Sequence, residues 1–315
     1  PDAGKQTYTI LVNSTNGTYQ NVVVATGEVT VQPYTLTVTK SDIAVSQTYD
    51  GTTAVANSNV MGKLGYTAPS FGDELSITYT SAAYNDASVA GASKVTFSGL
   101  KLEGTKAANY KLNVASFDVN AKITKAPLTI KANDNTITYG DAPAANGFIV
   151  VSGLCGNDKA DVVTGVTYTY GYQQNGNVGS YTITPAGGTA DNYEIKTYET
   201  GTLTVNPKAL TVTAGDLKVT KVYDGTNNAG VAAENTKLGL EGVVNNDNVQ
   251  VSYTTIGAYA DANVGSSKAV TISGLSLSGE KAGNYTISAT EQQITAGEIT
   301  KADLTAKMLS FAPAS

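Results

Sequence analysis

The sequence contains no histidine, no arginine and no tryptophan, and its only cysteine is Cys155. Without histidine the chain has neither a Ser-His-Asp triad nor a Cys-His pair, and the thiol lacks its usual activating base. One cysteine forms neither an internal disulfide nor a thiolate zinc site, so we interpret Cys155 as a buried or incidental thiol. No P-loop and no dinucleotide-binding glycine pattern is present. We therefore predict that the chain is not an enzyme, has no catalytic residues and binds no cofactor or metal.

Positive charge is also scarce, because all 20 basic residues are lysines and 26 residues are acidic, which gives a net charge of −6. Nucleic-acid binding usually needs a basic patch rich in arginine and lysine, so we predict no nucleic-acid partner. No apolar run is long enough to cross a membrane, and no signal peptide is visible, so we predict no membrane insertion by this segment. Since the chain opens in the middle of a pattern, we expect an internal piece of a longer protein.

What the sequence does contain is a long internal repeat. Tyr49-Asp50-Gly51-Thr52 recurs as Tyr223-Asp224-Gly225-Thr226, and each copy is followed by an acidic turn, at Asp73 and at Asp247. Both copies then continue to an Asn-Tyr pair, Asn109-Tyr110 and Asn284-Tyr285, and close on Ile-Thr-Lys-Ala. Such self-similarity marks tandem structural modules. We call this repeated unit module A.

A different unit, module B, separates the two A modules. It opens near Tyr139-Gly140-Asp141 and closes on Gly201-Thr202-Leu203-Thr204-Val205. The N-terminal residues echo its second half: Gly4 echoes Gly179, and Tyr8-Thr9-Ile10 echoes Tyr181-Thr182-Ile183. The predicted organisation is half of a B module at 1–34, an A module at 35–125, a B module at 126–208, an A module at 209–302, and the start of another module or a linker at 303–315.

The local pattern within each module favours β-strands. Runs such as Tyr34 to Thr39 alternate apolar and hydroxyl side chains, which places them on opposite faces of a strand. Turn signals rich in Gly, Asn and Asp recur every ~8–12 residues, a spacing typical of sandwiches and barrels. We predict an all-β chain of tandem antiparallel β-sandwich-like domains. Because proline-bearing junctions join them without flexible linkers, we expect them to stack end to end into an elongated rod.

These motifs resemble two known families. Module A resembles the YDG domain, through its Tyr-Asp-Gly-Thr opening, acidic turn, Gly-Leu-x-Leu-x-Gly run and Asn-Tyr ending. Module B is similar to the MBG (mostly-β glycan-binding) domain, through Tyr139-Gly140-Asp141, the Val-Gly-Ser-Tyr-Thr-Ile run and Asp191-Asn192-Tyr193. Both families occur in tandem in bacterial adhesins and filamentous-haemagglutinin-like proteins of the cell surface.

The resemblance implies an extracellular location, on the bacterial cell surface. It implies a stalk of an adhesin or fibril that extends and presents adhesive parts. The alternative is a glycan-binding module that attaches to carbohydrate. The expected partners are adjacent domains of the same long chain, together with host or environmental glycans or surface proteins.

The candidate ligand-binding residues are three tyrosines of module B, Tyr168, Tyr170 and Tyr172. Alternation places them on one face of a strand, and amide side chains follow at Gln173 and Gln174. Flat aromatic rings beside amides suit a sugar, whereas a core stripe gives the same pattern. The tyrosines that recur in module A, Tyr49 with Tyr223 and Tyr110 with Tyr285, have the same two interpretations. For these we favour core or edge anchors whose hydroxyls find backbone partners.

The repeated charged residues have structural interpretations too. We interpret the recurring aspartates as turn residues that bond their own backbone: Asp50 with Asp224, and Asp86 with Asp261. The acidic stretches Asn157-Asp158-Asp161 and Asn245-Asn246-Asp247 are too generic to support a calcium site. The repeated Lys94 and Lys268 suggest a hypothesis of intramolecular isopeptide bonds.

Overall fold

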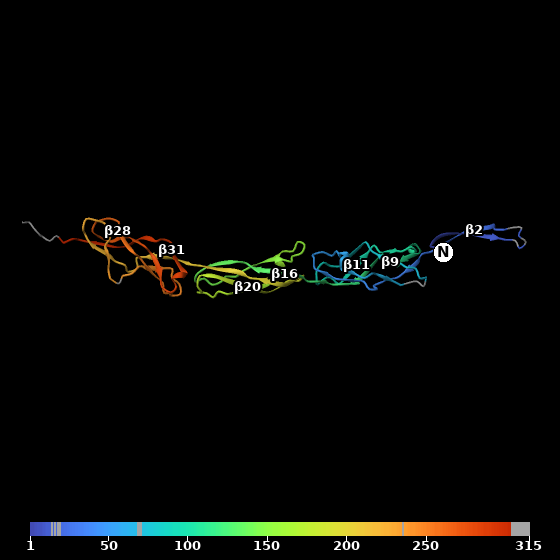
Figure 1. Cartoon of the computed structure of the whole chain (residues 1–315), viewed down its shortest axis with the longest axis horizontal. Coiled ribbons are helices and arrows are strands. Elements are labelled where there is room, and N and C mark those ends of the chain that lie inside the picture. Colours follow the sequence, from blue (N-terminus) through green and yellow to red (C-terminus); the bar gives the residue numbers. More distant parts are fainter. Residues whose placement is uncertain (14, 16, 18–19, 68–70, 235, 304–315) are drawn as a thin grey trace, which may run out of the picture. The chain divides into compact units, whose positions relative to one another are not determined.

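The computed structural model describes residues 1–13, 15, 17, 20–67, 71–234 and 236–303 (Figure 1). The expected further module or linker at 303–315 therefore lies outside the described residues from position 304 onward. The chain divides into two compact units. Unit 1 comprises Pro1–Lys131, Ile149–Thr167 and Ala186–Tyr198, and unit 2 comprises Ala132–Phe148, Tyr168–Pro185 and the residues from Glu199. Each unit thus contains one A module together with part of the B module.

Unit 1 begins with a hairpin of two antiparallel strands, β1 (Gly4–Val12) and β2 (Val22–Val31). Among the described residues these strands pair only with each other. Most of their side chains are exposed, including the apolar Tyr8, Ile10 and Val29. The hairpin therefore has the backbone hydrogen bonds of a sheet without a buried face.

The first A module lies wholly in unit 1 and is built from short strands with alternating burial. Leu36 and Val38 of the predicted alternating run are buried, as are Val95 and Phe97 on either side of the half-buried Thr96. Three strands form a sheet in the order β10-β11-β14, and the others pair two by two. The strands are β3 (Tyr34–Leu36), β4 (Val38–Thr39), β5 (Ala44–Val45), β6 (Gln47–Thr48), β7 (Val60–Met61), β8 (Gly65–Tyr66), β9 (Ser76–Thr78), β10 (Ser81–Tyr84), β11 (Lys94–Ser98), β12 (Lys101–Glu103), β13 (Tyr110–Leu112), β14 (Ser116–Asn120) and β15 (Ile123–Thr124).

The B module contributes two sheets. One has the order β18-β16-β21 and the other the order β17-β22-β20-β19. The strands are β16 (Ala126–Ala132), β17 (Asn135–Thr138), β18 (Phe148–Ser152), β19 (Thr164–Tyr170), β20 (Gly179–Thr189), β21 (Tyr193–Glu199) and β22 (Gly201–Asn206). In unit 2 the buried residues Tyr139, Ile183, Leu203 and Val205 belong to one apolar cluster.

The echo between the N-terminal residues and the B module is partly confirmed. The register of β1 on β2 matches that of β20 on β22, so Gly4 corresponds to Gly179 as predicted. In this register, however, Tyr8 corresponds to Ile183 and not to Tyr181. The predicted alignment of Tyr8 with Tyr181 is therefore wrong by two residues. The shared strand register matches the two glycines but does not match the two Tyr-Thr-Ile sequences that follow them.

The second A module lies wholly in unit 2. Its largest sheet has the order β25-β24-β32-β29-β28, and smaller sheets have the orders β26-β23-β31 and β27-β30. Val219, Val270 and Ile272 are fully buried in its core. The strands are β23 (Lys208–Thr213), β24 (Val219–Val222), β25 (Val231–Ala232), β26 (Gly239–Glu241), β27 (Gln250–Ser252), β28 (Thr255–Tyr259), β29 (Gly265–Ser273), β30 (Ser276–Ser278), β31 (Tyr285–Ile287) and β32 (Glu291–Thr300).

The prediction of an all-β chain is confirmed. The helices among the described residues are single 3₁₀ turns: η1 (Asn57–Asn59), η2 (Ala107–Asn109), η3 (Ala160–Val162) and η4 (Ala282–Asn284). None of the described helices has the length and apolar character needed to span a membrane.

The sheets are not purely antiparallel, which corrects the sequence prediction. In each module an early strand pairs in parallel with a late one: β3 with β13, β6 with β15, β17 with β22, β23 with β31, and β24 with β32. When the opening and closing strands run the same way, the chain enters a module at one end and leaves at the other. Parallel pairing also needs a long crossover, and the rest of the module provides it.

Candidate functional site

The three predicted ligand-binding tyrosines lie on the core side of the B module. Tyr172 is only 3% exposed, and its ring meets that of Tyr181 edge-on with centroids 5.1 Å apart. Tyr168 and Tyr170 are half-buried and pack against the same apolar cluster. The Tyr170 hydroxyl donates to the Ala144 carbonyl at 2.7 Å. The three rings therefore share one face, and that face packs largely against the apolar core of the protein.

A cluster that the sequence did not predict joins the first A module to the B module inside unit 1. The hydroxyls of Tyr49 and Tyr193 both donate to Oδ2 of Asp158, at 2.9 and 2.6 Å. Their rings meet edge-on with centroids 5.2 Å apart, and both side chains are buried. We call Tyr49, Asp158 and Tyr193 the first junction. It places a tyrosine of one module on a tyrosine and an aspartate of the next.

Local structure fixes each member of the first junction. Tyr49 directly follows β6, and its N–H donates to the Thr124 carbonyl at 2.8 Å. Asp158 ends a turn in which its N–H donates to the Cys155 carbonyl. The Cys155 N–H donates to the Tyr193 hydroxyl oxygen at 3.0 Å, so the turn and the ring hold each other. The single thiol is half-buried in this junction, where it donates to the Tyr49 carbonyl at 3.3 Å.

Unit 2 repeats this arrangement with different residues. The hydroxyls of Tyr139 and Tyr285 donate to Oδ2 of Asp247, at 2.8 and 2.7 Å. The rings meet edge-on at 5.3 Å, and both side chains are buried. The Val244 N–H donates to the Tyr285 hydroxyl oxygen at 3.1 Å, as Cys155 does to Tyr193. Tyr139, Asp247 and Tyr285 form the second junction, in which the B module supplies the incoming tyrosine.

In each junction, the asparagine directly before Tyr193 or Tyr285 accepts a hydrogen bond from the backbone of the preceding module. Asn192 Oδ1 accepts from the Val89 N–H at 3.0 Å in unit 1. Asn284 Oδ1 accepts from the Val178 N–H at 2.9 Å in unit 2. In both cases the donor belongs to the preceding module and lies just before a glycine-containing stretch. The Asn-Tyr motif therefore binds the preceding module twice, through its backbone and through its tyrosine.

The surroundings keep the tyrosines protonated. Burial, followed by the hydrogen bond to Asp158, raises the pKa of Tyr49 and of Tyr193. Burial and the hydrogen bond to Asp247 likewise raise the pKa of Tyr139, and they raise that of Tyr285 to about 12. A hydrogen bond to a charged group contributes about 1.5–3 kcal/mol, and an edge-on ring pair adds about 0.5–1.5 kcal/mol. In each junction, two neutral tyrosyl hydroxyls thus donate to one carboxylate, and these hydrogen bonds join one module to the next.

The remaining candidates are structural. The four repeated aspartates accept from backbone N–H groups two residues further on, as predicted for turns: Asp50, Asp86, Asp224 and Asp261. Lys94 pairs with Asp118, whereas its counterpart Lys268 pairs with Asp261, so the two lysines do not share an equivalent partner. Within the described residues no group of three or more His, Cys, Asp or Glu side chains is arranged to hold a metal ion.

The interpretation of Tyr49 as an anchor with a backbone partner needs correction, because its hydroxyl donates to the Asp158 carboxylate. For Tyr285 the expected backbone partner is confirmed, because its hydroxyl donates both to the Asp247 carboxylate at 2.7 Å and to the Val244 carbonyl at 3.3 Å. Asp158 and Asp247 were considered in the sequence only as calcium ligands, and their role as the shared acceptors of the junctions was not predicted. One signal was available, because each aspartate precedes its Asn-Tyr tyrosine by a similar distance, 35 residues for Asp158 and 38 for Asp247.

Comparison with family models confirms the resemblance to YDG and MBG domains. The model of the YDG domain matches residues 32–117 and 206–294, more than half of the chain. The chain belongs to the YDG-domain family. The model of the MBG domain (YGX type) matches residues 128–204 between the two YDG segments. We therefore call the A modules YDG modules and the B module the MBG module. No curated protein matches the chain.

The family names fit the geometry of the junctions. The tyrosine of the YDG opening, Tyr49, is the residue that the first YDG module inserts into the MBG module. The tyrosine of the Tyr-Gly-Asp turn, Tyr139, is the one that the MBG module inserts into the second YDG module. The motifs that define YDG and MBG sequences in this chain are therefore also the contacts between successive modules.

Proposed function

We propose that this chain is a repeat segment of a bacterial cell-surface adhesin or fibril. In this proposal its YDG and MBG modules act as a spacer that extends and presents adhesive parts located elsewhere in the polypeptide. The observation that carries the proposal is the tyrosine–aspartate junction, which occurs at both ends of the MBG module with the same geometry. Modules built to be joined in series suit a spacer.

The strand directions support this proposal. A spacer on a cell surface carries tension from one end of the chain to the other. In the second YDG module, β24 and β32 pair in parallel from Val219 with Gly297 to Val222 with Thr300. Pulling an opening strand and a closing strand apart along parallel directions loads their hydrogen bonds in shear, so that several break together. Such a module resists extension better than one whose end strands are peeled apart bond by bond.

Force spectroscopy of the full chain, held by its two ends, tests the spacer proposal. We expect discrete force peaks, with a length gain for a YDG module of roughly 300 Å, since an extended residue spans at most ~3.3–3.6 Å. We also expect Tyr49→Phe to lower the unfolding force of the first YDG module. The matched substitution Tyr223→Phe should leave all force peaks unchanged. Smooth extension without peaks would show that the chain bears no load and would contradict the proposal.

The location and partners are part of the same proposal. We place the chain outside the cell, with the adjacent domains of its own polypeptide as its constant partners and without a catalytic role. Surface biotinylation of intact cells that express the longer protein tests the location. Labelling of its lysines only after the cells are lysed would contradict it.

Carbohydrate binding is the outcome that would displace a pure spacer. A glycan array with the full chain tests it, and Tyr170→Ala is the informative variant because Tyr170 is only half-buried. Tyr172→Ala serves as a folding control, since this residue belongs to the core. Specific binding that Tyr170→Ala abolishes, while circular dichroism stays unchanged, would assign a lectin function to the MBG module. Absence of binding across a broad array supports the spacer.

A further inference from the structure

The first YDG module contains half of a third junction, namely Asp73 and Tyr110, which correspond to Asp247 and Tyr285 of the second junction. The Tyr110 hydroxyl donates to Oδ2 of Asp73, as the Tyr285 hydroxyl does to Asp247. Asn109 Oδ1 accepts from the Ala3 N–H at 2.6 Å, the contact that Asn284 makes with Val178. Within the described part of the chain Asp73 receives one tyrosyl hydroxyl, where Asp158 and Asp247 each receive two.

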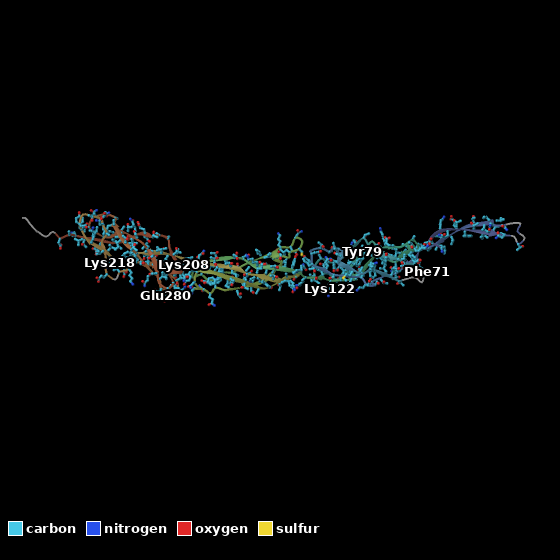
Figure 2. All side chains as sticks on the ribbon, viewed as in Figure 1. Phe71, Tyr79, Lys122, Lys208, Lys218 and Glu280 are labelled. Carbon is cyan, nitrogen blue, oxygen red and sulfur yellow. The ribbon has the colours of Figure 1, made fainter. Side chains whose placement is uncertain are left out.

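A cavity of about 430 Å³ lies beside this half-junction. Its walls include Asp73, Tyr110, Val31, Tyr34 and Phe71. Phe71, labelled in Figure 2, is 69% exposed and meets the Tyr34 ring edge-on at 6.1 Å. The cavity thus combines an aromatic wall with a carboxylate acceptor, the two features with which the second junction holds the ring and the hydroxyl of Tyr139.

The adjoining β1–β2 hairpin has the register of β20–β22, and its apolar side chains are uncovered. Val29 is 51% exposed, whereas its counterpart Leu203 in the MBG module is fully buried. The strand β22 pairs in parallel with β17, and in the described residues β2 has β1 as its only neighbour. What the hairpin lacks is therefore what residues 126–178 provide in the complete MBG module.

The tyrosine that one module inserts into the next also depends on that next module, which covers its ring. Tyr49 and Tyr223 occupy the same position in the two YDG modules, and both donate a backbone N–H to the closing strand, at 2.8 and 2.9 Å. Tyr49, which contacts Asp158 and Tyr193, is 8% exposed, whereas Tyr223 is 45% exposed. The burial of a junction tyrosine therefore depends on the next module and not on its own.

We propose that the hairpin and the Asp73–Tyr110 cavity form one docking surface for the first half of an MBG-type module, covalently continuous with the hairpin. This segment lays a strand equivalent to β17 along β2. Its Tyr-Gly-Asp turn places a tyrosyl hydroxyl on Asp73. The inference rests on the geometry of the junctions and is independent of the spacer function.

The chain's own residues favour this occupant over a second copy of the protein. Asp2 and Ala3 already make the contacts of Asn177 and Val178: Asp2 Oδ1 accepts from Asn109 Nδ2 at 2.8 Å, as Asn177 Oδ1 does from Asn284 at 3.1 Å. The backbone thus enters the hairpin along the path of an intact module. In a second copy, by contrast, Tyr139 is already bound to Asp247 and would first have to be released.

The test is an extended chain in which a second copy of residues 126–176 directly precedes Asp2 in place of Pro1. Amide hydrogen exchange is compared with that of the chain as it stands. We expect exchange of β1 and β2 amides to slow by at least about tenfold, because their strands gain a neighbour and a covered face. We also expect the added segment itself to become protected. Unchanged exchange in the hairpin, or an unprotected added segment, would overturn the proposal.

A second variant separates the cavity from the hairpin. Tyr139→Phe in the added copy keeps the ring and removes the hydroxyl meant for Asp73. We expect the hairpin to stay protected while exchange around Asp73 and Tyr110 returns toward that of the unextended chain. The same substitution at the original Tyr139 is the matched control and should loosen the region around Asp247 and Tyr285.

Two outcomes would reject parts of the inference. If the added Tyr→Phe substitution leaves exchange around Asp73 unchanged while the control responds, the cavity does not receive that tyrosine. If the unextended chain protects its hairpin in proportion to its own concentration, the occupant is a second copy and the covalent source is wrong.

Discussion

At the residue scale, a few polar atoms decide how the modules are joined. A buried tyrosyl hydroxyl must be hydrogen-bonded, because an unpaired buried donor costs about 1–3 kcal/mol. Each junction satisfies two such hydroxyls with one carboxylate, Asp158 or Asp247. The repeat supplies its own control, because the same tyrosine is buried at position 49 and largely exposed at position 223.

We therefore expect Tyr49→Phe to lower the free energy of unfolding of unit 1 by about 1.5–3 kcal/mol, since the ring stays and one hydrogen bond to a charged acceptor is lost. Tyr223→Phe should change stability by no more than about 0.5 kcal/mol, as is usual for an exposed position. Urea denaturation followed by circular dichroism measures both. Equal effects of the two substitutions would contradict the role given to Asp158.

The same hydroxyls predict a loss of stability at alkaline pH. The pKa of Tyr285 rises from the ordinary value of 10.0 to about 12 in the folded protein. A raised pKa means that folding favours the protonated form, so the stabilisation is complete below pH 10 and is lost as pH rises toward about 12. Urea midpoints of unit 2 measured across this range should fall, and Tyr285→Phe should flatten the decline. A decline of the same slope in the variant would assign the effect to other groups.

At the element scale, burial depends on the neighbours of a strand more than on its sequence. β2 and β22 share a register and an alternating pattern, yet only β22 has an apolar face that is covered. The opening and closing strands pair in parallel, which alternation alone does not reveal, because side chains alternate between faces in parallel and in antiparallel strands.

Matched substitutions in these two strands should differ sharply. Leu203→Ala should cost about 2–5 kcal/mol, because it opens a cavity in a packed core. Val29→Ala, at the corresponding position of the hairpin, should change stability by no more than about 0.5 kcal/mol. Thermal unfolding monitored by circular dichroism measures both. A large effect at Val29 would mean that the hairpin face is already covered in solution.

At the scale of the whole molecule, the compact units do not follow the repeat. Residues 149–167 and 186–198 of the MBG module belong with the first YDG module, and residues 132–148 and 168–185 belong with the second. The junctions explain this division, because each lies inside a unit and binds part of the MBG module to the YDG module beside it.

This division predicts which segments open together. In amide exchange under mild urea, Tyr49→Phe should speed exchange in residues 149–167 and 186–198 along with the first YDG module. Exchange in residues 168–185 should stay as in the unsubstituted chain, since these residues belong to the unit built around Asp247. Uniform acceleration across the whole MBG module would show that it opens as one body and that the junction does not set the limits of cooperativity.

Three properties could be predicted from the sequence alone: the tandem order of YDG and MBG segments, the all-β class, and the turn roles of aspartates such as Asp50 and Asp224. These properties follow from local patterns, since alternation, Asp-Gly turns and recurring motifs are all read along the chain. Three other properties are visible only in the folded chain: the parallel pairing of opening and closing strands, the core position of Tyr172, and the role of Asp158 and Asp247 as shared acceptors. These features depend on contacts between residues far apart in the chain. The local sequence around Asp158 and Asp247 does not distinguish them from other aspartates, because their tyrosine partners become neighbours only on folding.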